Sequence, residues 1–561
     1  MQIFVKGKGG VSLSKNNFVG QGGEAGIYAI GDTAYKIYNN PKQTIPYAKI
    51  QELSSLKDPK IINPQNIILD KNNKPIGYTM RFLKNTISLC QIFTKAFRDR
   101  NNISSDIMFK LIEDMQKTIQ HIHDNNILIV DLNELNFLVN NKFTEIYFID
   151  VDSYQTPSFP ATALMESVRD RHSPQFSKLT DWFSFGIISF QMFIGIHPFK
   201  GKHSKLKTLD ERMLTNVPVF HKDVAYPKVC QPFDIVPQTY KDWYKSIFTS
   251  SKRLPPPTGA QLVTVIITKP HKIVGNEGFD VIELERFNDD IINYLSLFGI
   301  KLTQTASGLY KDSKTISTDE DNTCLAITPK NNIIIEGKIV DDKLILKDVL
   351  NNKILDCNIS AEKIMSYDGR IYIKNNDILS EINFIEIPNN LQAVPHTIGN
   401  VMEHATQVYD GVVIQNMLGS FVASISPQSK TCYQIIIPEF EGYKIIEAKY
   451  DNQVLMVIGN KKGKYDKFII KLNSEFNSYL IRKVDDIFYS GINFVVLDNG
   501  IVIHINENEE LEIFSNKKDK NTIKVISNSI ITGDMRLFKN GTQVLFSRKN
   551  ILYRLKTKGD L

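Results

Sequence analysis

The chain of 561 residues is longer than one hydrophobic core usually serves, so its length indicates two or more domains. Apolar residues make up 42% and charged residues 23%, an ordinary balance for globular proteins that argues against long disordered stretches. The formal net charge of +6 is small for this length and thinly spread, which argues against a concentrated basic face for a nucleic-acid backbone.

The cysteines and the N-terminal residues indicate a reducing, cytoplasmic environment. The five cysteines are far apart and form no Cys-x-x-Cys pair, so we expect free thiols rather than a metal site or a disulfide scaffold. The first residues, MQIFVKGKGG, lack the apolar core and cleavage site of a signal peptide, and no apolar stretch is long enough to span a bilayer. We therefore expect no membrane segment.

The first half of the sequence has strands first and helices later. Short strand-like runs broken by glycines extend from Phe4 to about Lys36. Apolar residues at helical spacing then predict helices over 103–123 and 182–194. Between them, the segment 153–176 is rich in Ser, Pro and Arg and is typical of a long surface loop. These features predict a mixed α+β domain over residues 1–270.

The second half is nearly all β in pattern. After a linker or helical segment at 271–311, short β-branched and aromatic runs bounded by Asn, Asp or Gly turns continue over 312–561. The aromatic residues that open these turns recur at a period of about 40 residues, which is typical of four-stranded propeller blades. They are Tyr367, Tyr409, Tyr450, Tyr489 and Phe538. We expect a β-propeller of about six blades, give or take one, with a pair of β-sandwiches as the alternative.

A glycine-rich loop lies between the first strands. In GQGGEAGIYAI, Gly20, Gly22 and Gly23 would allow backbone amides to approach a triphosphate without side-chain clash. By itself such a loop is more often an ordinary hairpin. The following strand, AYKIY, places Lys36 where its ammonium group could reach the α and β phosphates. The earlier KGKGGVSLSK has no Gly-Lys-Ser/Thr at the spacing of a P-loop, so we reject it as a phosphate site.

Polar residues that suit phosphoryl transfer follow the first helix. In ILIVDLNELNFLV, Asp131 and Asn136 are five positions apart, and Asp150 ends an apolar strand fourteen residues later. A carboxylate near the nucleophile and oxygen ligands for Mg²⁺ are what phosphoryl transfer requires. Each residue alone is more often a turn or cap residue, but their order and spacing together favour a catalytic site. Asp181, at the start of the second helix, is either its N-cap or a buried anchor for the catalytic loop.

Residues from about Phe18 to Pro257 resemble a protein kinase in the order of these features. The phrases GQGGEAGIY, AYKIY, DLNELNFLV, FIDVDSYQ, SPQF and GIHPFKG resemble, more narrowly, a bacterial family of atypical kinases often described with a helix-hairpin-helix segment. The resemblance implies a two-lobed domain that binds ATP between its lobes, with Lys36 on the phosphates. It further implies Asp131 as catalytic base and Asn136 with Asp150 as Mg²⁺ ligands.

The partner of the lysine is also implied by the resemblance. Glu52 on the C-helix would form an ion pair with Lys36, although Glu24 and nearby polar residues compete for it. The segment 79–83 would be the hinge beside the adenine. His197 in the HPF phrase is expected to be a structural residue at a helix end rather than a base.

The sequence departs from typical kinases at several positions. Ile129 and Val130 stand where typical kinases have His-Arg, which argues against regulation by loop phosphorylation. Asn133 replaces the lysine two residues after the catalytic Asp, and Asp152 replaces the Gly after the metal-binding Asp. Asp152 could bind a further Mg²⁺ or cap the following loop, and we expect the loop cap. These departures predict slow catalysis or an unusual acceptor.

Two hypotheses of function follow. The first is an ATP- and Mg²⁺-dependent protein kinase of Ser/Thr type, whose C-terminal β domain recruits a protein substrate or partner. The alternative is a pseudokinase scaffold that binds nucleotide and acts through protein contacts. DNA binding through 269–299 is disfavoured because that segment has no clear basic stripe.

Overall fold

The computed structural model describes residues 1–561 except 258–278, 319–322, 388–389, 518–519, 521 and 558–561. The chain divides into two compact units. Unit 1 comprises Met1–Lys269 together with two short segments, Asn460–Tyr465 and Phe488–Gly491, and unit 2 comprises the remainder. In the described residues no helix has the length and apolar character needed to cross a membrane.

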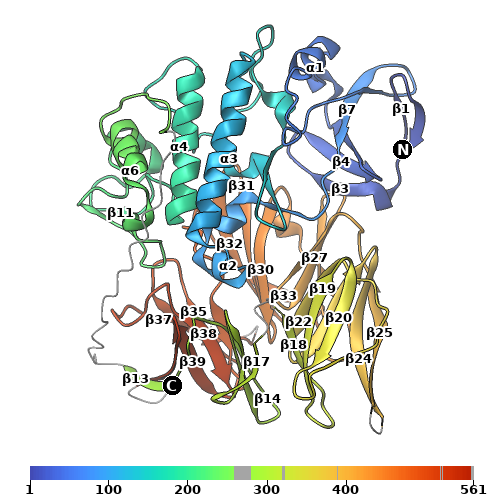
Figure 1. The fold of residues 1–561 in the computed structure, drawn as a ribbon, viewed down its shortest axis with the longest axis vertical. Helices are drawn as coiled ribbons and strands as arrows, with labels where there is room; N and C mark the ends of the chain where they lie inside the picture. Colours follow the sequence, from blue (N-terminus) through green and yellow to red (C-terminus); the bar gives the residue numbers. More distant parts are fainter. Residues whose placement is uncertain (258–278, 319–322, 388–389, 518–519, 521, 558–561) are drawn as a thin grey trace. The chain divides into compact units, whose positions relative to one another are not determined.

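Unit 1 begins with a seven-stranded antiparallel sheet in the order β2-β1-β6-β7-β5-β4-β3 (Figure 1). Its strands are β1 (Gln2–Val5), β2 (Gly9–Ser12), β3 (Phe18–Gln21), β4 (Ala25–Ile30), β5 (Thr33–Tyr38), β6 (Ile67–Leu69) and β7 (Pro75–Arg81). Strand β5 therefore lies between β4 and β7, and its side chains alternate between the two faces of the sheet. The strands expected between Phe4 and Lys36 are present. Helix α1 (Tyr47–Leu53) connects β5 to β6.

The rest of unit 1 is mainly helical. Its helices are α2 (Lys95–Arg100), α3 (Ser105–Asp124), α4 (Lys178–Ile194), α5 (Leu209–Leu214), α6 (Gln238–Tyr244) and the π-helical turn η7 (Lys245–Thr249). Short 3-10 turns are η1 (Lys15–Asn17), η2 (Pro41–Gln43), η3 (Leu89–Phe93), η4 (Glu134–Asn136), η5 (Val151–Ser153) and η6 (Phe233–Ile235). Two small sheets accompany them, β10 (Ile146–Phe148)-β9 (Phe137–Asn140)-β8 (Thr86–Ser88) and β11 (Lys202–His203)-β12 (Val224–Ala225). Figure 1 shows α3 and α4 side by side.

The two long helices follow the sequence prediction closely. One face of α3 is buried and the other exposed, as its apolar spacing predicted, and the helix is capped by the Ser104 side chain. Helix α4 starts one turn earlier than predicted, because Ser177 and Thr180 form a capping box. It ends at Gly195, whose φ of 89° is accessible to glycine without strain. Asp181 is thus not the N-cap, and that interpretation was wrong.

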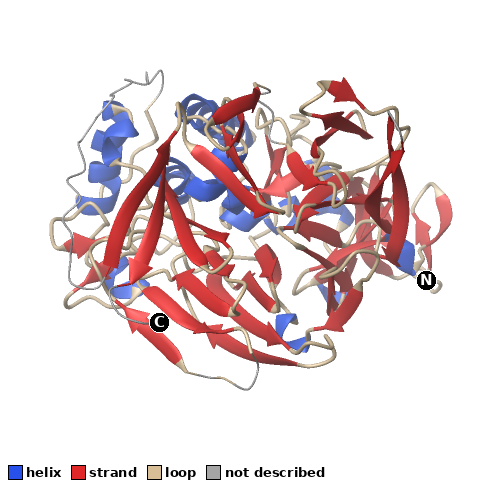
Figure 2. Ribbon diagram, turned by 90° about the horizontal axis from the view of Figure 1, so that it is seen from below, coloured by secondary structure: helices blue, strands red, loops and turns tan. Residues whose placement is uncertain are grey.

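Unit 2 consists of four-stranded antiparallel sheets, and seven are found in its described residues (Figure 2). Six are consecutive in sequence: β14 (Ile291–Leu297), β15 (Ile300–Thr305), β16 (Gly308–Lys311), β17 (Lys314–Ser317); β18 (Cys324–Ile327), β19 (Ile334–Val340), β20 (Lys343–Asp348), β21 (Lys353–Ile354); β22 (Lys363–Tyr367), β23 (Arg370–Asn375), β24 (Ile378–Ile387), β25 (Asn390–Asn400); β26 (Thr406–Tyr409), β27 (Val412–Met417), β28 (Ser420–Ile425), β29 (Tyr433–Ile436); β30 (Lys444–Asp451), β31 (Val454–Lys461), β32 (Lys464–Leu472), β33 (Tyr479–Val484); and β34 (Phe494–Val496), β35 (Ile501–Ile505), β36 (Leu511–Ser515), β37 (Ile523–Ile526). One 3-10 turn, η8 (Pro438–Phe440), accompanies them.

The seventh sheet joins the two ends of unit 2. Its order is β13-β40-β39-β38, with β13 (Phe279–Arg286) from the start of the unit and β38 (Arg536–Asn540), β39 (Gln543–Arg548) and β40 (Ile551–Thr557) from its end. The segment 271–311 was expected to be a linker or helical. Its described part, 279–311, instead forms β13 to β16, so this prediction was wrong. Its apolar residues alternate weakly, and the strands become evident only through pairing.

The repeated turns of unit 2 explain the sequence period. Tyr367, Tyr409 and Tyr450 lie in the first strand of a sheet. Phe538 lies in β38 of the sheet that joins the two ends of unit 2, and Tyr489 precedes β34. Asp368 and Gly369 illustrate the turn chemistry, with φ values of 49° and 69° that match a two-residue hairpin. The five aromatic residues mark five of the seven described sheets; β14–β17 and β18–β21 lack one, which is why the sequence period indicated fewer blades than there are sheets.

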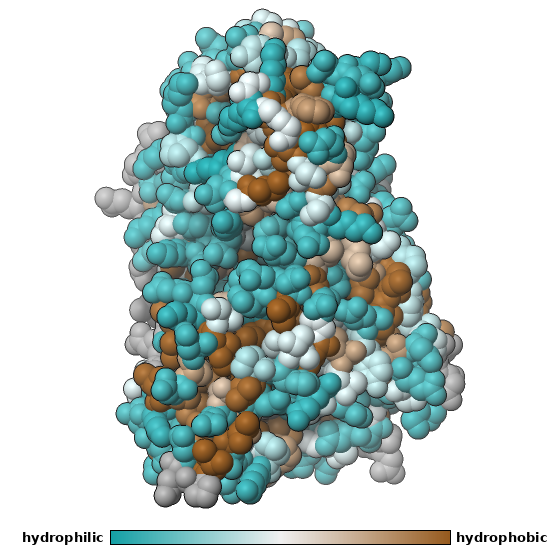
Figure 3. All heavy atoms as spheres, turned by 90° about the vertical axis from the view of Figure 1, so that its right-hand side faces the viewer, coloured by the Kyte–Doolittle hydropathy of each residue, from teal (hydrophilic) through white to brown (hydrophobic). Residues whose placement is uncertain are grey.

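The surface carries scattered apolar side chains. Figure 3 shows a face on which hydrophobic residues gather in separate patches among hydrophilic ones. On the hairpin β24–β25, exposed apolar residues include Ile385, Ile387 and Val394. None of the five cysteines, all of which lie in described residues, forms a disulfide.

Candidate active site

The lysine predicted to bind phosphate is buried at the centre of the first sheet. Lys36 lies on β5, opposite Ile27 of β4 on one side and Tyr78 of β7 on the other. Its exposed fraction is only 6%. A buried ammonium group is stable only when paired, so its partners define the site.

Two aspartates hold the lysine. The Lys36 Nζ atom lies 2.6 Å from Asp150 Oδ1, and 2.9 and 2.8 Å from the two carboxylate oxygens of Asp152. Asp150 follows β10 with a left-handed backbone, φ 61° and ψ 32°, and begins the turn η5. This turn carries both carboxylates toward the sheet. The prediction that Lys36 and Asp150 belong to one site therefore agrees with the geometry.

Asp152 is not a loop cap, and the expectation that it was one is wrong. Its side chain is 5% exposed and accepts hydrogen bonds from the hydroxyl groups of Tyr38 and Tyr78 in addition to Lys36. Tyr38 is two residues after Lys36 on β5, and Tyr78 is paired with Lys36 across β7, so all three side chains share one face of the sheet. The lysine Nζ also lies 5.5 and 5.7 Å from the two ring centroids.

The predicted ion pair between Lys36 and Glu52 is not present. Glu52, near the end of α1, accepts a hydrogen bond of 3.3 Å from the backbone N–H of Ser158 instead. Hydrogen bonding from Ser158 lowers the pKa of Glu52 below its usual value. Glu24, the sequence's other candidate, lies near the cluster; burial and then the charge of Asp150 raise the pKa of its carboxyl group. Asp152 takes the place that the resemblance gave to Glu52.

Electrostatics bind the cluster together. Burial alone would lower the pKa of Lys36, but the negative charges of Asp150 and Asp152 outweigh it and raise that pKa. Burial opposes ionisation of Asp152, yet Lys36 and the two tyrosine hydroxyls keep the pKa of its carboxyl group below the usual value. For Asp150, burial and the neighbouring Asp152 raise the pKa against the opposing charge of Lys36. Asp152 is thus the firmly ionised partner.

Asp131 and Asn136, which the sequence placed in one site, lie together. The Asn136 side-chain amide donates to the backbone oxygen of Asp131 at 3.0 Å and to its Oδ2 atom at 3.1 Å. The other carboxylate oxygen of Asp131 accepts the backbone N–H of Met165 at 2.6 Å. Met165 belongs to the predicted loop 153–176. Both carboxylate oxygens of Asp131 are therefore engaged.

Asp181 anchors this loop from α4, as one of its two sequence interpretations predicted. Its carboxylate accepts the backbone N–H groups of Ile129 at 2.8 Å and Val130 at 2.9 Å, and contacts His123 Nε2 at 2.9 Å. Val130 has φ 63°, a conformation that β-branched residues rarely adopt. Two hydrogen bonds to a buried carboxylate hold the strained backbone that presents Asp131.

The glycine loop has room for a ligand. A Cβ atom at Gly20 or Gly23 would meet no atom within 4 Å, and at Gly22 only the Ala25 carbonyl oxygen at 4.0 Å. None of the three has the positive φ that would itself favour glycine. Neither packing nor backbone conformation therefore explains the glycines. Space beside backbone amides is what phosphate groups would use.

The donor set suits a hard cation. Asp150, Asp152 and Asn136 supply carboxylate and amide oxygens, the ligand atoms that Mg²⁺ prefers. Because the Asn136 nitrogen donates to Asp131, its oxygen is the atom left for a metal. Across the residues the structure describes, no group of three His, Cys, Asp or Glu side chains has the geometry of a metal centre. Asp150 is held by Lys36, so the metal site is not preformed.

Three site residues were missed or misassigned from the sequence. Tyr38 and Tyr78 gave no signal because tyrosines in apolar strands are usually core residues. The spacing of Asp150 and Asp152 did offer a signal for Asp152, because residues two apart can point to the same side of an extended segment. Only the tertiary structure brings β5, β7 and η5 together.

No known family model matches this chain. Among solved structures, the kinase PK-1 of the Cydia pomonella granulovirus is similar to it, with a TM-score of 0.32 and 13% sequence identity. The similarity covers 42% of this chain and 86% of the viral protein. The interpretation of unit 1 as kinase-like therefore depends on the arrangement of its own residues.

Proposed function

We propose that unit 1 binds ATP with Mg²⁺ and transfers the γ-phosphoryl group to a hydroxyl group of a protein, as a Ser/Thr-type kinase does. The observation that carries the proposal is the buried contact of 2.6 Å between Lys36 and Asp150, which joins the sheet to the turn after β10. The pair Asp131 and Asn136 completes the set of groups that phosphoryl transfer uses.

Each residue has a distinct role in this proposal. The backbone amides of Gly20, Gly22 and Gly23 lie along the phosphates, and Lys36 binds the α and β phosphates. Asn136 and Asp150 would hold Mg²⁺, which would neutralise charge that develops on the phosphates. Asp131 accepts the proton of the acceptor hydroxyl as the new O–P bond forms and the bond to ADP breaks. Thr79 and the residues to Leu83 would lie beside the adenine.

The acceptor must displace a contact before it reaches the base. Asp131 Oδ1 now accepts the Met165 N–H, so the segment around Met165 moves when a hydroxyl group approaches that oxygen. An engaged base costs the enzyme the free energy of one charge-assisted hydrogen bond, about 1.5–3 kcal/mol. This fits the slow catalysis expected from the sequence.

For unit 2 we infer a β-propeller that recruits the protein substrate or partner. Seven successive four-stranded antiparallel sheets support it, together with the pairing of β13 with β40, which joins the beginning of the unit to its end. A sheet formed by strands from both ends of the unit would close a ring of blades. Recruitment is an analogy at the level of the fold, because propellers serve many functions. A cytoplasmic location remains a prediction.

The second candidate function is a pseudokinase scaffold that binds nucleotide without transfer. Asn133 favours it, because this residue occupies the position of the phosphate-steadying lysine in typical kinases. The Asn133 side chain is 1% exposed and accepts the Leu135 N–H at 2.9 Å within its own turn. It is thus unable to serve a transferring phosphate.

The deciding experiment incubates the purified chain with γ-labelled ATP and Mg²⁺. We expect label in the chain itself or in an added protein substrate, lost in Asp150→Ala and Asp131→Ala. Loss of either role typically costs at least about 100-fold in rate. A matched control is Asp99→Ala, which removes a half-exposed carboxylate on α2 that pairs with Lys95.

The outcomes separate the two functions. Label abolished by both substitutions and retained in Asp99→Ala supports the kinase. ATP binding by the wild-type chain without any transfer supports the scaffold. No ATP binding at millimolar nucleotide would contradict both.

A further inference from the structure

The ammonium group of Lys36 is fully committed to the two aspartates. An ammonium group has three N–H donors, and the three contacts of Lys36 reach Asp150 once and Asp152 twice. Nucleotide binding, as proposed above, recruits Asp150 to the metal. The lysine must then keep another anion beside it, because a buried lysine without a counter-charge is strongly destabilised.

Asp152 is built into the sheet in a way that Asp150 is not. Its two oxygens accept hydrogen bonds from hydroxyl groups on two neighbouring strands, Tyr38 on β5 and Tyr78 on β7. The Asp152 side chain is 5% exposed, whereas that of Asp150 is 36% exposed. Asp150 is therefore free to turn toward solvent and a metal, and Asp152 is not.

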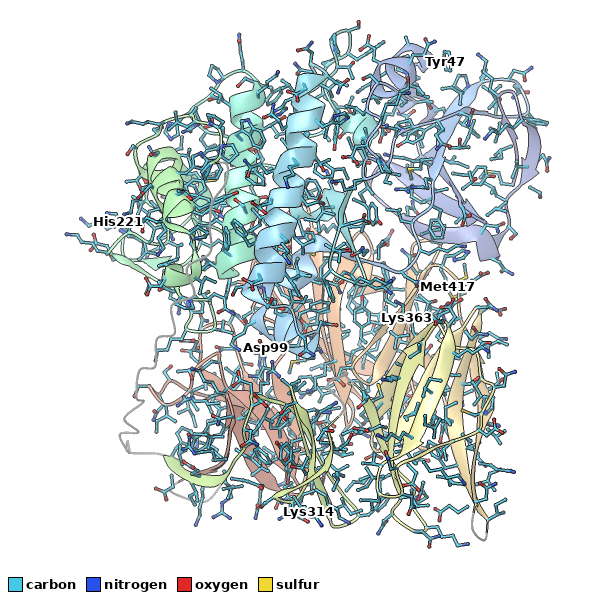
Figure 4. All side chains as sticks on the ribbon, viewed as in Figure 1. Tyr47, Asp99, His221, Lys314, Lys363 and Met417 are labelled. Carbon is cyan, nitrogen blue, oxygen red and sulfur yellow. The ribbon has the colours of Figure 1, made fainter. Side chains whose placement is uncertain are left out.

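Helix α1 does not supply the counter-charge in this chain. It has seven residues, fewer than an isolated helix needs for stability. Glu52 is engaged with the loop residue Ser158. Tyr47, at the first residue of α1, is 49% exposed and lies at the outside of the unit (Figure 4).

A second buried lysine lies on helix α1. Lys49 of α1 is 2% exposed, and its Nζ atom has no hydrogen-bond partner among the described residues. It lies within the electrostatic reach of Asp152 and Glu52. Burial lowers the pKa of Lys49, and the charges of Asp152 and Glu52 oppose that shift.

From these contacts we propose that Asp152, and not Glu52, is the positioning residue that holds Lys36 in place for the nucleotide. This inference rests on the proposed function, since it concerns how the phosphate-binding lysine is positioned. Tyr38 and Tyr78 fix Asp152 in turn. The position of Lys36 is consequently set by groups of the sheet and of the turn η5.

The first test is a double-mutant cycle on ATP affinity measured without Mg²⁺, so that metal binding does not contribute. Asp152→Asn, nearly equal in size, is expected to weaken binding about tenfold, because Lys36 then turns wholly to Asp150. In a Lys36→Ala background the same substitution should change affinity by less than about twofold, since its effect acts through the lysine. Glu52→Gln should leave Mg²⁺-free affinity within about twofold of wild type.

Two outcomes would overturn the inference. One is a loss of ATP affinity in Asp152→Asn that persists in the Lys36→Ala background or appears only with Mg²⁺. Either result would make Asp152 a direct ligand of the nucleotide or the metal. The other is a tenfold loss in Glu52→Gln. Tyr78→Phe serves as a second variant in case Asp152→Asn misfolds, because it keeps the carboxylate and removes only one of its hydrogen bonds. We expect it to weaken ATP binding less than Asp152→Asn does, and to have no effect on ATP affinity in the Lys36→Ala background.

The second test needs no nucleotide, so it separates this inference from the proposed function. Acetylation of lysines by acetic anhydride, followed by mass spectrometry, reports how well each amine is protected by burial and ion pairing. Lys36 should react several-fold faster in Asp152→Asn and at the wild-type rate in Glu52→Gln. Lys374, with 2% side-chain exposure and a 2.6 Å contact to Glu362, is the internal control in unit 2. Equal Lys36 rates in wild type and Asp152→Asn would contradict the inference even if the chain binds ATP.

Discussion

At the scale of single residues, Asp181 holds the loop that precedes Asp131. It is 1% exposed and accepts two backbone N–H groups of a loop whose Val130 has a strained conformation. Buried acceptors of this kind are costly to lose, because the donors they satisfy have no water to replace them. The sequence suggested this role for Asp181 but not the residues it would hold.

We expect Asp181→Asn to destabilise unit 1 by about 2–3 kcal/mol, because an amide presents only one acceptor oxygen to two backbone donors. Urea denaturation followed by fluorescence would measure the change. Asp124→Asn, on the exposed end of α3, is the control and should have little effect. Equal midpoints for the two variants would mean that Asp181 does not hold the loop.

At the scale of elements, the glycine loop and strand β7 give opposite predictions for the same substitution. A Cβ at Gly23 meets nothing within 4 Å, whereas a Cβ at Gly77 would lie 2.0 Å from the Lys36 carbonyl oxygen of β5. One glycine faces open space and the other allows two strands to approach. The two residues therefore separate ligand binding from folding.

Gly23→Ala should leave the free energy of unfolding within about 0.5 kcal/mol of wild type and weaken ATP binding about tenfold, because the methyl group enters the space proposed for phosphate. Gly77→Ala should destabilise unit 1 by at least about 1–3 kcal/mol through strand displacement. Thermal unfolding and calorimetric titration with ATP would measure both. Unchanged ATP affinity in Gly23→Ala would argue against the glycine loop as the phosphate site.

At the scale of the whole molecule, unit 2 depends on strands from both its ends. Strand β40 pairs with β13 on one side and β39 on the other, and its Leu552, Tyr553 and Leu555 are buried. A chain that ends after Arg548 should lose the cooperative unfolding transition of unit 2, since β13 would have no partner. Differential scanning calorimetry would show this. A chain that ends after Thr557 keeps every described strand and should unfold like wild type.

Two buried histidines make both units sensitive to acid. His197 accepts the Phe199 N–H at Nδ1 and its Nε2 lies 2.9 Å from the Ser167 oxygen, so it is neutral; burial lowers its pKa to about 3. His504 lies between Lys467 and Glu512, and burial and then the charge of Lys467 lower its pKa to about 4. A histidine in the unfolded chain is protonated below about pH 6.5, whereas these two buried histidines stay neutral down to their lower folded pKa values. The unfolded chain therefore binds more protons than the folded chain in that pH range.

These histidines should not change the free energy of unfolding above about pH 6.5. As the pH falls below that value, each should lower the free energy of unfolding by about 1.4 kcal/mol per pH unit, down to its folded pKa. Urea denaturation between pH 7.5 and 5 would measure the slope. His197→Asn should reduce the slope of unit 1 and His504→Asn that of unit 2. His221→Asn, at a half-exposed site (Figure 4), is the control and should leave both slopes unchanged. Equal slopes in all variants would exclude the histidines.

The sequence by itself determined the local structure and the residue types of the site. Caps, helical periodicity and turn residues are local signals, so α3, α4 and the turns of unit 2 were predictable. The order of Lys36, Asp131, Asn136 and Asp150 was likewise readable from spacing. Only the tertiary structure decided which anion pairs with Lys36. That partner is fixed by β5, β7 and η5, which are distant in sequence, and burial selects Asp152 because two tyrosine hydroxyls satisfy its charge.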